Sequence, residues 1–223
     1  MGRKALIGVV CILAAGAVRS VALADNPQLR PSAADQAIAK HAVVQLSDFT
    51  PGSGWTGGPT KSGTSPTTPC NLDPKQSDLV QTGEAESTFK YKVPLLQVYS
   101  SATMFRTSTM ARLSWERARP GLLGFLRCMT TKALPSYARV VSVKPMGFPQ
   151  VGSFGGAYRT VFDLTAGATT VRMVIDVEVF GAGRAVMFLM QFAPYQGAAE
   201  AKAGETRLAT VMTARAGGGG LAA

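Results

Sequence analysis

The fold is decided by residues 157–193, which read AYRTVFDLTAGATTVRMVIDVEVFGAGRAVMFLMQFA. Two turns that contain glycine divide this stretch into three apolar segments, at about 157–164, 169–179 and 184–193. Connections this short join strands that pair antiparallel. The stretch therefore predicts a three-stranded antiparallel meander.

A turn at Ala166 and Gly167 predicts the register of the first hairpin, in which Tyr158 faces Ile175 and the numbers of paired residues add up to 333. In this register both strands place their apolar side chains on the same face. The third segment is apolar on both faces. We therefore expect it at the centre of the sheet, covered on both sides.

The remaining periodicities predict further strands and helices that pack on this sheet. Strands are expected over 84–91, 95–99 and 138–143, and helices after Ser32, from Ser100 or Ser101 towards Trp115, from Leu122 to Ala133 beyond a break at Pro120-Gly121, and from Ala201 to Met212. The predicted fold class is α+β: an antiparallel sheet with a C-terminal three-strand meander and helices packed on the sheet.

The first 24 residues have the pattern of a secretory signal peptide. Arg3 and Lys4 precede the apolar run 5–18, and Ala22-Leu23-Ala24 is a small-x-small cleavage site. The alternative is a membrane anchor, which needs about 20 apolar residues, but Arg19 ends the run too early. We expect a secreted protein of the cell envelope, cleaved near Ala24, without a transmembrane segment.

Differences in composition divide the rest of the chain into three parts. We expect a short N-terminal helix or linker over 25–41, a single α+β domain over 42–215 and a flexible glycine-rich tail over 216–223. Within the domain, 17 of the 19 residues in 51–69 are Gly, Pro, Ser or Thr, which predicts a long loop without regular structure. Trp55 lies in this loop, either as a lid or contact residue for a ligand or as a plug on the core.

Cys70 and Cys128 are the cysteines that remain once the leader, with its Cys11, is removed. In an oxidising compartment the simplest expectation is a disulfide between them. The alternative is two free thiols.

One histidine and 13 acidic residues exclude most metal enzymes and most histidine-based chemistry. His41 could be a general base, with Ser153 near a pocket, but it is more typical of a surface residue on the N-terminal helix. No nucleophile motif, metal-ligand spacing or cofactor motif is found, so we expect no catalytic residues, metal or cofactor.

Asp176 and Glu178 lie on one face of the second meander strand. Two carboxyl groups can be an acid pair of a hydrolase. Beside Arg159 and Arg172 they are more typical of a cross-strand lattice of ion pairs.

The net charge is +10 for the whole chain. Without the leader it is +7, from 20 Lys and Arg against 13 Asp and Glu. Such a charge favours anionic partners. The basic residues are scattered and few aromatic residues lie among them, so we expect no nucleic acid as partner.

Several short motifs occur in an order that resembles actinobacterial secreted domains. They are Leu46-Ser47-Asp48-Phe49, Val98-Tyr99-Ser100-Ser101, Leu126-Arg127-Cys128, Gly152-Ser153, Ala157-Tyr158-Arg159 and Gly183-Arg184-Ala185-Val186. The chain resembles the extracellular sensor domain of PknH-type receptor kinases and LpqN-type lipoproteins with a PsbP-like fold. It differs in lacking a lipid-attachment cysteine, a kinase domain and a second cysteine pair.

This resemblance implies a non-catalytic module that binds a ligand or a partner. Our first functional expectation is a ligand-binding or sensor-like module of the bacterial cell envelope, with an apolar cleft between the sheet and a helix for a small apolar ligand. One alternative is an interaction protein held by charge on an anionic wall component. Another alternative is a hydrolase of unknown substrate.

Overall fold

A computed structural model of the chain describes residues 26–60, 70, 74–92, 96–132 and 134–217. The elements along the chain are β1 (Gln28–Leu29), α2 (Ala33–Ala42), η2 (Leu46–Asp48), β2 (Trp55–Thr60), β3 (Val80–Tyr91), β4 (Gln97–Phe105), α3 (Ser108–Lys132), β5 (Ala138–Pro145), β6 (Phe154–Ala166), β7 (Thr169–Ala182), β8 (Ala185–Pro194), η3 (Tyr195–Gly197) and α4 (Ala198–Gly217). The predicted signal peptide lies outside the described residues, as does the tail beyond Gly217.

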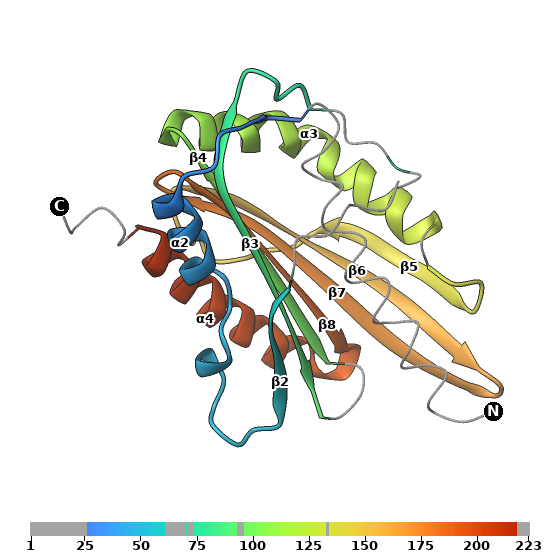
Figure 1. Cartoon of the computed structure of the whole chain (residues 1–223). Coiled ribbons are helices and arrows are strands. Elements are labelled where there is room, and N and C mark those ends of the chain that lie inside the picture. Colours follow the sequence, from blue (N-terminus) through green and yellow to red (C-terminus); the bar gives the residue numbers. More distant parts are fainter. Residues whose placement is uncertain (1–25, 61–69, 71–73, 93–95, 133, 218–223) are drawn as a thin grey trace.

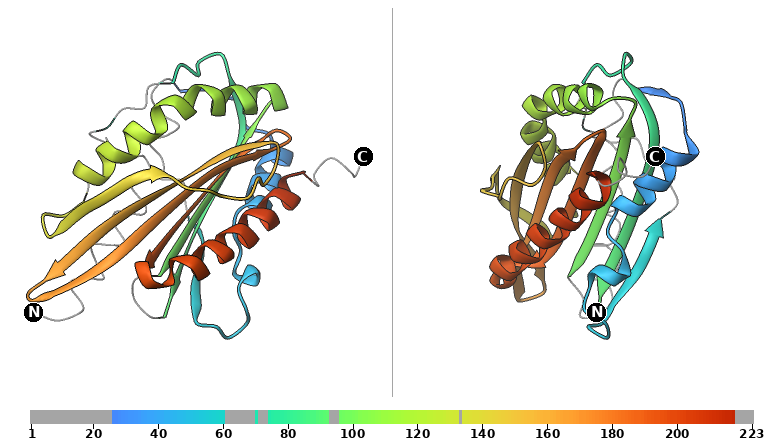
Figure 2. Two further views of the ribbon diagram at one scale, coloured as in Figure 1. Left: turned by 180° about the vertical axis from the view of Figure 1, so that it is seen from behind. Right: turned by 90° about the vertical axis from the view of Figure 1, so that its left-hand side faces the viewer.

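The strands form one eight-stranded sheet in the order β1-β3-β4-β8-β7-β6-β5, and β2 pairs with the outer side of β3. Only β1 and β3 pair parallel among the strands described. Helix α3 covers one face of the sheet, whereas α2 and α4 cover the other (Figures 1 and 2). The predicted α+β class with a C-terminal meander is confirmed.

Strand β8 is the central strand of the sheet, as its sequence predicts. It pairs with β4 on one side and with β7 on the other. Met187 and Leu189 are fully buried in the core below α2 and α4, while Phe188 belongs to the core below α3. Both faces of the strand are therefore covered by helices (Figure 2).

The hairpin of β6 and β7 differs from the predicted register by two residues. Ala166 pairs with Thr169, so the turn lies at Gly167 and Ala168 and the numbers of paired residues add up to 335. Gly167 has a positive φ of 61°, which glycine adopts at no steric cost and which a tight hairpin turn requires. A shift of two residues leaves every side chain on its predicted face, so the prediction of the apolar face stands.

Two expectations about the helices were wrong. The helix that follows β4 does not start at Ser100 or Ser101, because β4 continues to Phe105 and the hydroxyls of Ser100 and Ser87 lie 2.8 Å apart in the core. Pro120 does not divide the next segment either, because α3 runs through it from Ser108 to Lys132. An interior proline costs about 3 kcal/mol, and the apolar stripe buried on both sides of it offsets this cost.

Residues 55–60 form a strand, which corrects part of the expected loop over 51–69. Strand β2 pairs antiparallel with β3 over its whole length. Pro59 fits because β2 has a strand on one side only, where a missing N–H is tolerated. At Gly57 (φ 144°) an added Cβ would lie 2.1 Å from the carbonyl oxygen of Thr88, so the close pairing requires glycine there. Residues 61–69 lie outside the described residues.

Cys70 and Cys128 form the predicted disulfide. The bond connects α3 to the segment that precedes β3, and Cys70 is buried in the core below α3. No helix among the described residues has the length and apolar character needed to cross a membrane.

Replacing both cysteines, Cys70→Ser with Cys128→Ser, is expected to lower the free energy of unfolding by about 4 kcal/mol, because the bridge closes a loop of 58 residues in the unfolded chain. Urea denaturation of the oxidised wild type and the double variant measures this difference. Reduced wild type is the control and should unfold like the variant. An unchanged midpoint would contradict the stabilising role.

Candidate functional site

An apolar cleft lies between α4 and the end of the sheet formed by β2, β4 and β8. Its volume is about 350 Å³, which is within the range of small-molecule sites. The cleft, which we call the Trp55 cleft, is lined by Phe49, Trp55, Leu96, Val98, Gln191, Ala193, Pro194, Gly197, Glu200, Ala201, Gly204, Arg207 and Leu208. Few of these side chains are polar, so the cleft is suited to an apolar ligand.

Trp55 is held by two neighbouring rings at the start of β2. Its ring stacks on Phe49, with the centroids 4.4 Å apart, and meets Tyr91 at 5.4 Å. Phe49 in turn contacts Phe89 in the core. Trp55 itself is half-buried. The ring therefore forms a fixed wall of the cleft that is still partly accessible.

Polar contacts connect η2 to α4 and so fix the distance between the two walls. The carboxylate of Asp48 accepts hydrogen bonds from Arg215 at 2.5 and 2.8 Å. Arg207 donates to the carbonyl oxygen of Asp48 at 2.6 Å. Since Phe49 directly follows Asp48, these bonds also position the ring on which Trp55 stacks.

A cluster of charged side chains is buried below α4, next to the floor of the cleft. It consists of Arg159 on β6, Asp176 and Glu178 on β7, and Glu205 on α4, and we call it the carboxyl cluster. Asp176 pairs across the strands with Gln191, which lines the Trp55 cleft. The three carboxyl groups are almost completely buried.

One ion pair lies inside this cluster. Arg159 donates to Asp176 through Nε at 2.6 Å and through Nη2 at 2.5 Å, and this bond raises the pKa of the guanidinium. Arg159 also donates to the carbonyl oxygen of Ala198 in the first turn of α4, at 3.3 Å. The pair thus connects the sheet to the start of the helix.

Glu178 and Glu205 have no such partner. Neither carboxyl group has a donor in hydrogen-bonding position among the described residues, and the two side chains face each other. Burial raises the pKa of Glu205 to about 8, with the charge of Asp176 as the next cause. The pKa of Glu178 is raised for the same reason and by Glu205. Burial and the neighbouring acids therefore favour the protonated form of the pair, because both disfavour its negative charge.

The predicted lattice of ion pairs on β7 is confirmed for Asp176, which pairs with an arginine, and wrong for Glu178, which does not. Arg159 binds Asp176, but Arg172 binds Asp163 at 2.8 Å, and Glu178 faces another acid. Glu205 was missed, although its helical spacing from Ala201 and Leu208 places it on the buried stripe of α4.

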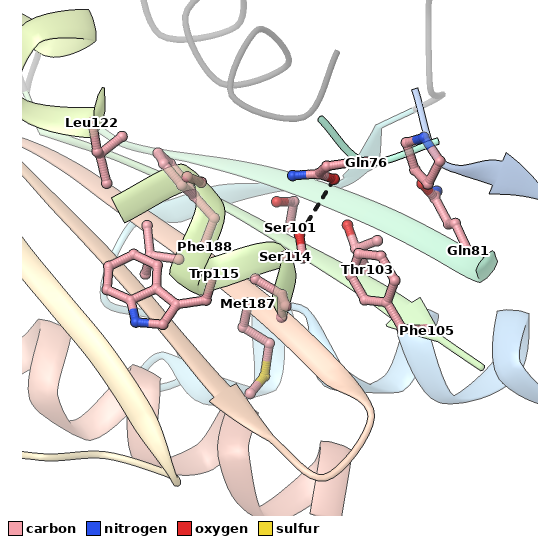
Figure 3. A pocket seen from close by; sticks show the side chains of 14 residues that line it. Gln76, Gln81, Ser101, Thr103, Phe105, Ser114, Trp115, Leu122, Met187 and Phe188 are labelled. Carbon is pink, nitrogen blue, oxygen red and sulfur yellow. Dashed lines mark hydrogen bonds between the residues drawn. The ribbon is translucent and has the colours of Figure 1, made fainter. Parts of the chain in front are cut away.

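A second cavity lies between α3 and the sheet, on the opposite face from the Trp55 cleft (Figure 3). Its volume is only about 80 Å³, which is room for a few water molecules. Trp115, Leu122 and Phe188 line it, and Ser114 donates to Gln76 across it at 3.4 Å. Without movement of α3 this cavity is too small for a ligand of ordinary size.

His41 and Ser153 are not brought together, whereas Asp176 and Glu178 meet in the carboxyl cluster. His41 lies on α2, where Gln45 contacts its ring nitrogen and its carbonyl oxygen. Ser153 donates to the carbonyl oxygen of Gly181 at 3.1 Å. Neither residue lines the Trp55 cleft or the cavity below α3. Among the described residues no group of acidic, histidine or cysteine side chains is placed to hold a metal ion.

The raised pKa values predict a loss of stability at alkaline pH. From the ordinary pKa of 4.5 up to about 8 the folded state holds a proton on Glu205 that the unfolded chain has released. The free energy of unfolding therefore falls in this range as pH rises, by about 1.4 kcal/mol per pH unit for each such proton. Thermal unfolding between pH 5 and about pH 9 measures the slope.

Glu205→Gln combined with Glu178→Gln should reduce this slope and make the protein more stable than wild type at the alkaline end, because no carboxyl group must stay protonated. Glu200→Gln is the matched control, since Glu200 is an exposed acid of the same helix, and should leave the slope unchanged. Identical slopes in wild type and in the double variant would refute the shared proton.

No family model matches the chain, and the comparison with curated proteins found no match. Among solved structures, the chain is similar to the crystal structure of the extracellular domain of PknH from Mycobacterium tuberculosis. The TM-score is 0.53 at 13% sequence identity, and the match covers 84% of this chain and 97% of that chain. At this identity the likeness shows the fold alone. It confirms the expected PknH-type resemblance as a resemblance of fold, while the likeness to LpqN-type lipoproteins stays a prediction.

Proposed function

We propose that the protein is a secreted, non-catalytic module of the bacterial cell envelope that binds a small apolar ligand in the Trp55 cleft. The observation that carries this proposal is the cleft itself, an apolar hollow of about 350 Å³ with a half-buried tryptophan as one wall. Aromatic walls with a few polar groups at the rim are typical of sites for small molecules. Here the polar groups are Gln191, Glu200 and Arg207.

Three further observations support a location outside the cell. The first 24 residues have the pattern of an export signal. The disulfide between Cys70 and Cys128 is typical of oxidising compartments. The fold is similar to that of an extracellular domain.

A wall-binding protein held by charge is the second candidate. It is favoured by exposed arginine side chains on α3, of which Arg112, Arg119 and Arg127 have no ion pair within 4.0 Å among the described residues. Such a protein would be released from isolated cell walls by salt, because exposed charges are screened. Hydrolysis has less support, because His41, Ser153 and Asp176 line neither the Trp55 cleft nor the cavity below α3.

Binding can be tested by incubating the mature protein with a bacterial lipid extract and analysing the complex by native mass spectrometry. We expect a bound apolar molecule in wild type. Trp55→Ala should weaken binding about tenfold or more, because burying an aromatic ring on a ligand contributes on the order of 1 to 3 kcal/mol. Ala201→Phe should prevent binding, because Ala201 lines the cleft and a larger side chain would fill it.

Tyr195→Ala is the matched control, since this exposed ring belongs to η3 and does not line the cleft. In a fluorescence titration with a neutral naphthylamine probe, Tyr195→Ala should bind the probe as tightly as wild type. Trp55→Ala should bind it more weakly, and Ala201→Phe should not bind it. Recovery of no small molecule, together with salt-sensitive binding to isolated cell walls, would overturn the proposal in favour of the second candidate.

A further inference from the structure

A groove separate from the Trp55 cleft lies at the start of β6. It is bounded by the first half of α3, by β6 and by residues 146–151, and its volume is about 650 Å³. This groove, which we call the β6 groove, shares no lining residue with the Trp55 cleft. The lining residues that matter here are Arg112, Trp115, Arg119, Phe154, Gly155 and Glu178.

Two guanidinium groups at the rim are available to an anion. Arg112 and Arg119 are exposed, and neither has an ion pair within 4.0 Å among the described residues. The guanidinium of Arg112 lies over the ring of Phe154, 5.6 Å from its centroid, which holds it at the groove. Glu116 lies between the two arginines along the helix, without an ion pair to either. The rim is therefore positive.

The floor of the groove contains a sheet edge without a neighbouring strand. Strand β5 ends at Pro145, which lies opposite Tyr158 of β6. The next residue, Met146, donates its N–H to the carbonyl oxygen of Ala157, and this is the last backbone hydrogen bond that β6 receives on its β5 side. Backbone groups in a strand alternate in direction, so those of Gly155, two residues earlier, also point away from β7. In the part of the chain that the structure describes, no backbone partner bonds to Gly155 on this side. The N–H and C=O of Gly155 are therefore available to a further extended segment.

The buried floor does not oppose an acidic occupant. Glu178 lines the groove from below, but burial and Glu205 raise the pKa of this carboxyl group well above its usual range. Burial thus disfavours a negative charge on the floor, whereas the rim is positive. Trp115 and Phe154, which stack with centroids 6.4 Å apart, add apolar surface for side chains.

We propose that the β6 groove binds an extended segment of a partner protein, which pairs with the free edge of β6 at Gly155 and places acidic side chains at Arg112 and Arg119. Main-chain hydrogen bonds to a sheet edge provide affinity for any extended peptide, and side-chain contacts select the sequence. A polar polymer without amide groups could use the arginines but has no periodic backbone to match the edge. This inference concerns a second surface and does not depend on the Trp55 cleft.

Selection of short random peptides displayed on phage against the folded mature protein tests the proposal. We expect enriched sequences with Asp or Glu at alternate positions, since alternate side chains of a strand point to the same face. Arg112→Gln with Arg119→Gln should weaken binding of a synthetic peptide of the enriched sequence about tenfold or more. Amide hydrogen exchange at Gly155 should slow when this peptide is bound.

Arg127→Gln with Lys132→Gln is the matched control, because it removes the same charge from exposed positions of α3 outside the groove; its peptide affinity should equal that of wild type. Peptides without acidic residues, equal affinity in both double variants, or unchanged exchange at Gly155 would each overturn the proposal. The proposal would also be overturned if the wild type enriched no peptides beyond those that the arginine double variant enriches. It would be overturned if inorganic polyphosphate bound through the arginines while acidic peptides did not. A concentration-dependent dimer that the arginine substitutions abolish would overturn it as well.

Discussion

The apolar character of β8 on both faces is the constraint on which the rest of the structure depends. A strand of this kind cannot face water on either side, so the sheet needs a helical layer on each face. Helix α3 covers Phe188 on one face, whereas α2 and α4 cover Met187 and Leu189 on the other. Neither layer spans the whole width of the sheet (Figure 2). The Trp55 cleft lies at the border of the α4 layer, and the β6 groove lies at the edge of the sheet beside α3.

The carboxyl cluster is the exception to this apolar core. Burying charge costs several kcal/mol per ion unless it is paired, and only Asp176 has a paired charge, from Arg159. Burial raises the pKa of Glu178 and of Glu205, so both acids favour the neutral form, which lowers this cost. Because Glu205 is on α4 and the other members are on the sheet, the position of the helix and the protonation of the cluster depend on each other. The same helix forms one wall of the Trp55 cleft.

Local patterns in the sequence were sufficient for the meander, the central place of β8, the disulfide and the fold class. The register of the β6–β7 hairpin was two residues off, because both turns keep the same apolar face. The turn at Gly167 and Ala168 forms because it places glycine first, where φ is positive. β2 was missed because its Gly and Pro content is typical of loops, and pairing with β3 outweighs that preference. The ring of Trp55 and the two rings that hold it belong to three separate segments of the chain. No local pattern therefore predicts the contacts of Trp55 with Phe49 and Tyr91.

The carboxyl cluster also lies between the two surfaces proposed for binding. Gln191 lines the Trp55 cleft and is the cross-strand neighbour of Asp176, while Glu178, two residues further along β7, lines the β6 groove. Any ligand that moves α4 changes the free energy of ionising this pair of acids, because Glu205 lies on that helix. Linkage is reciprocal, so the affinity for a ligand that shifts the pKa of the pair must depend on pH in the range where the pair titrates. The two proposed binding surfaces thus lie on either side of one pair of acids, whose ionisation is linked to the position of α4.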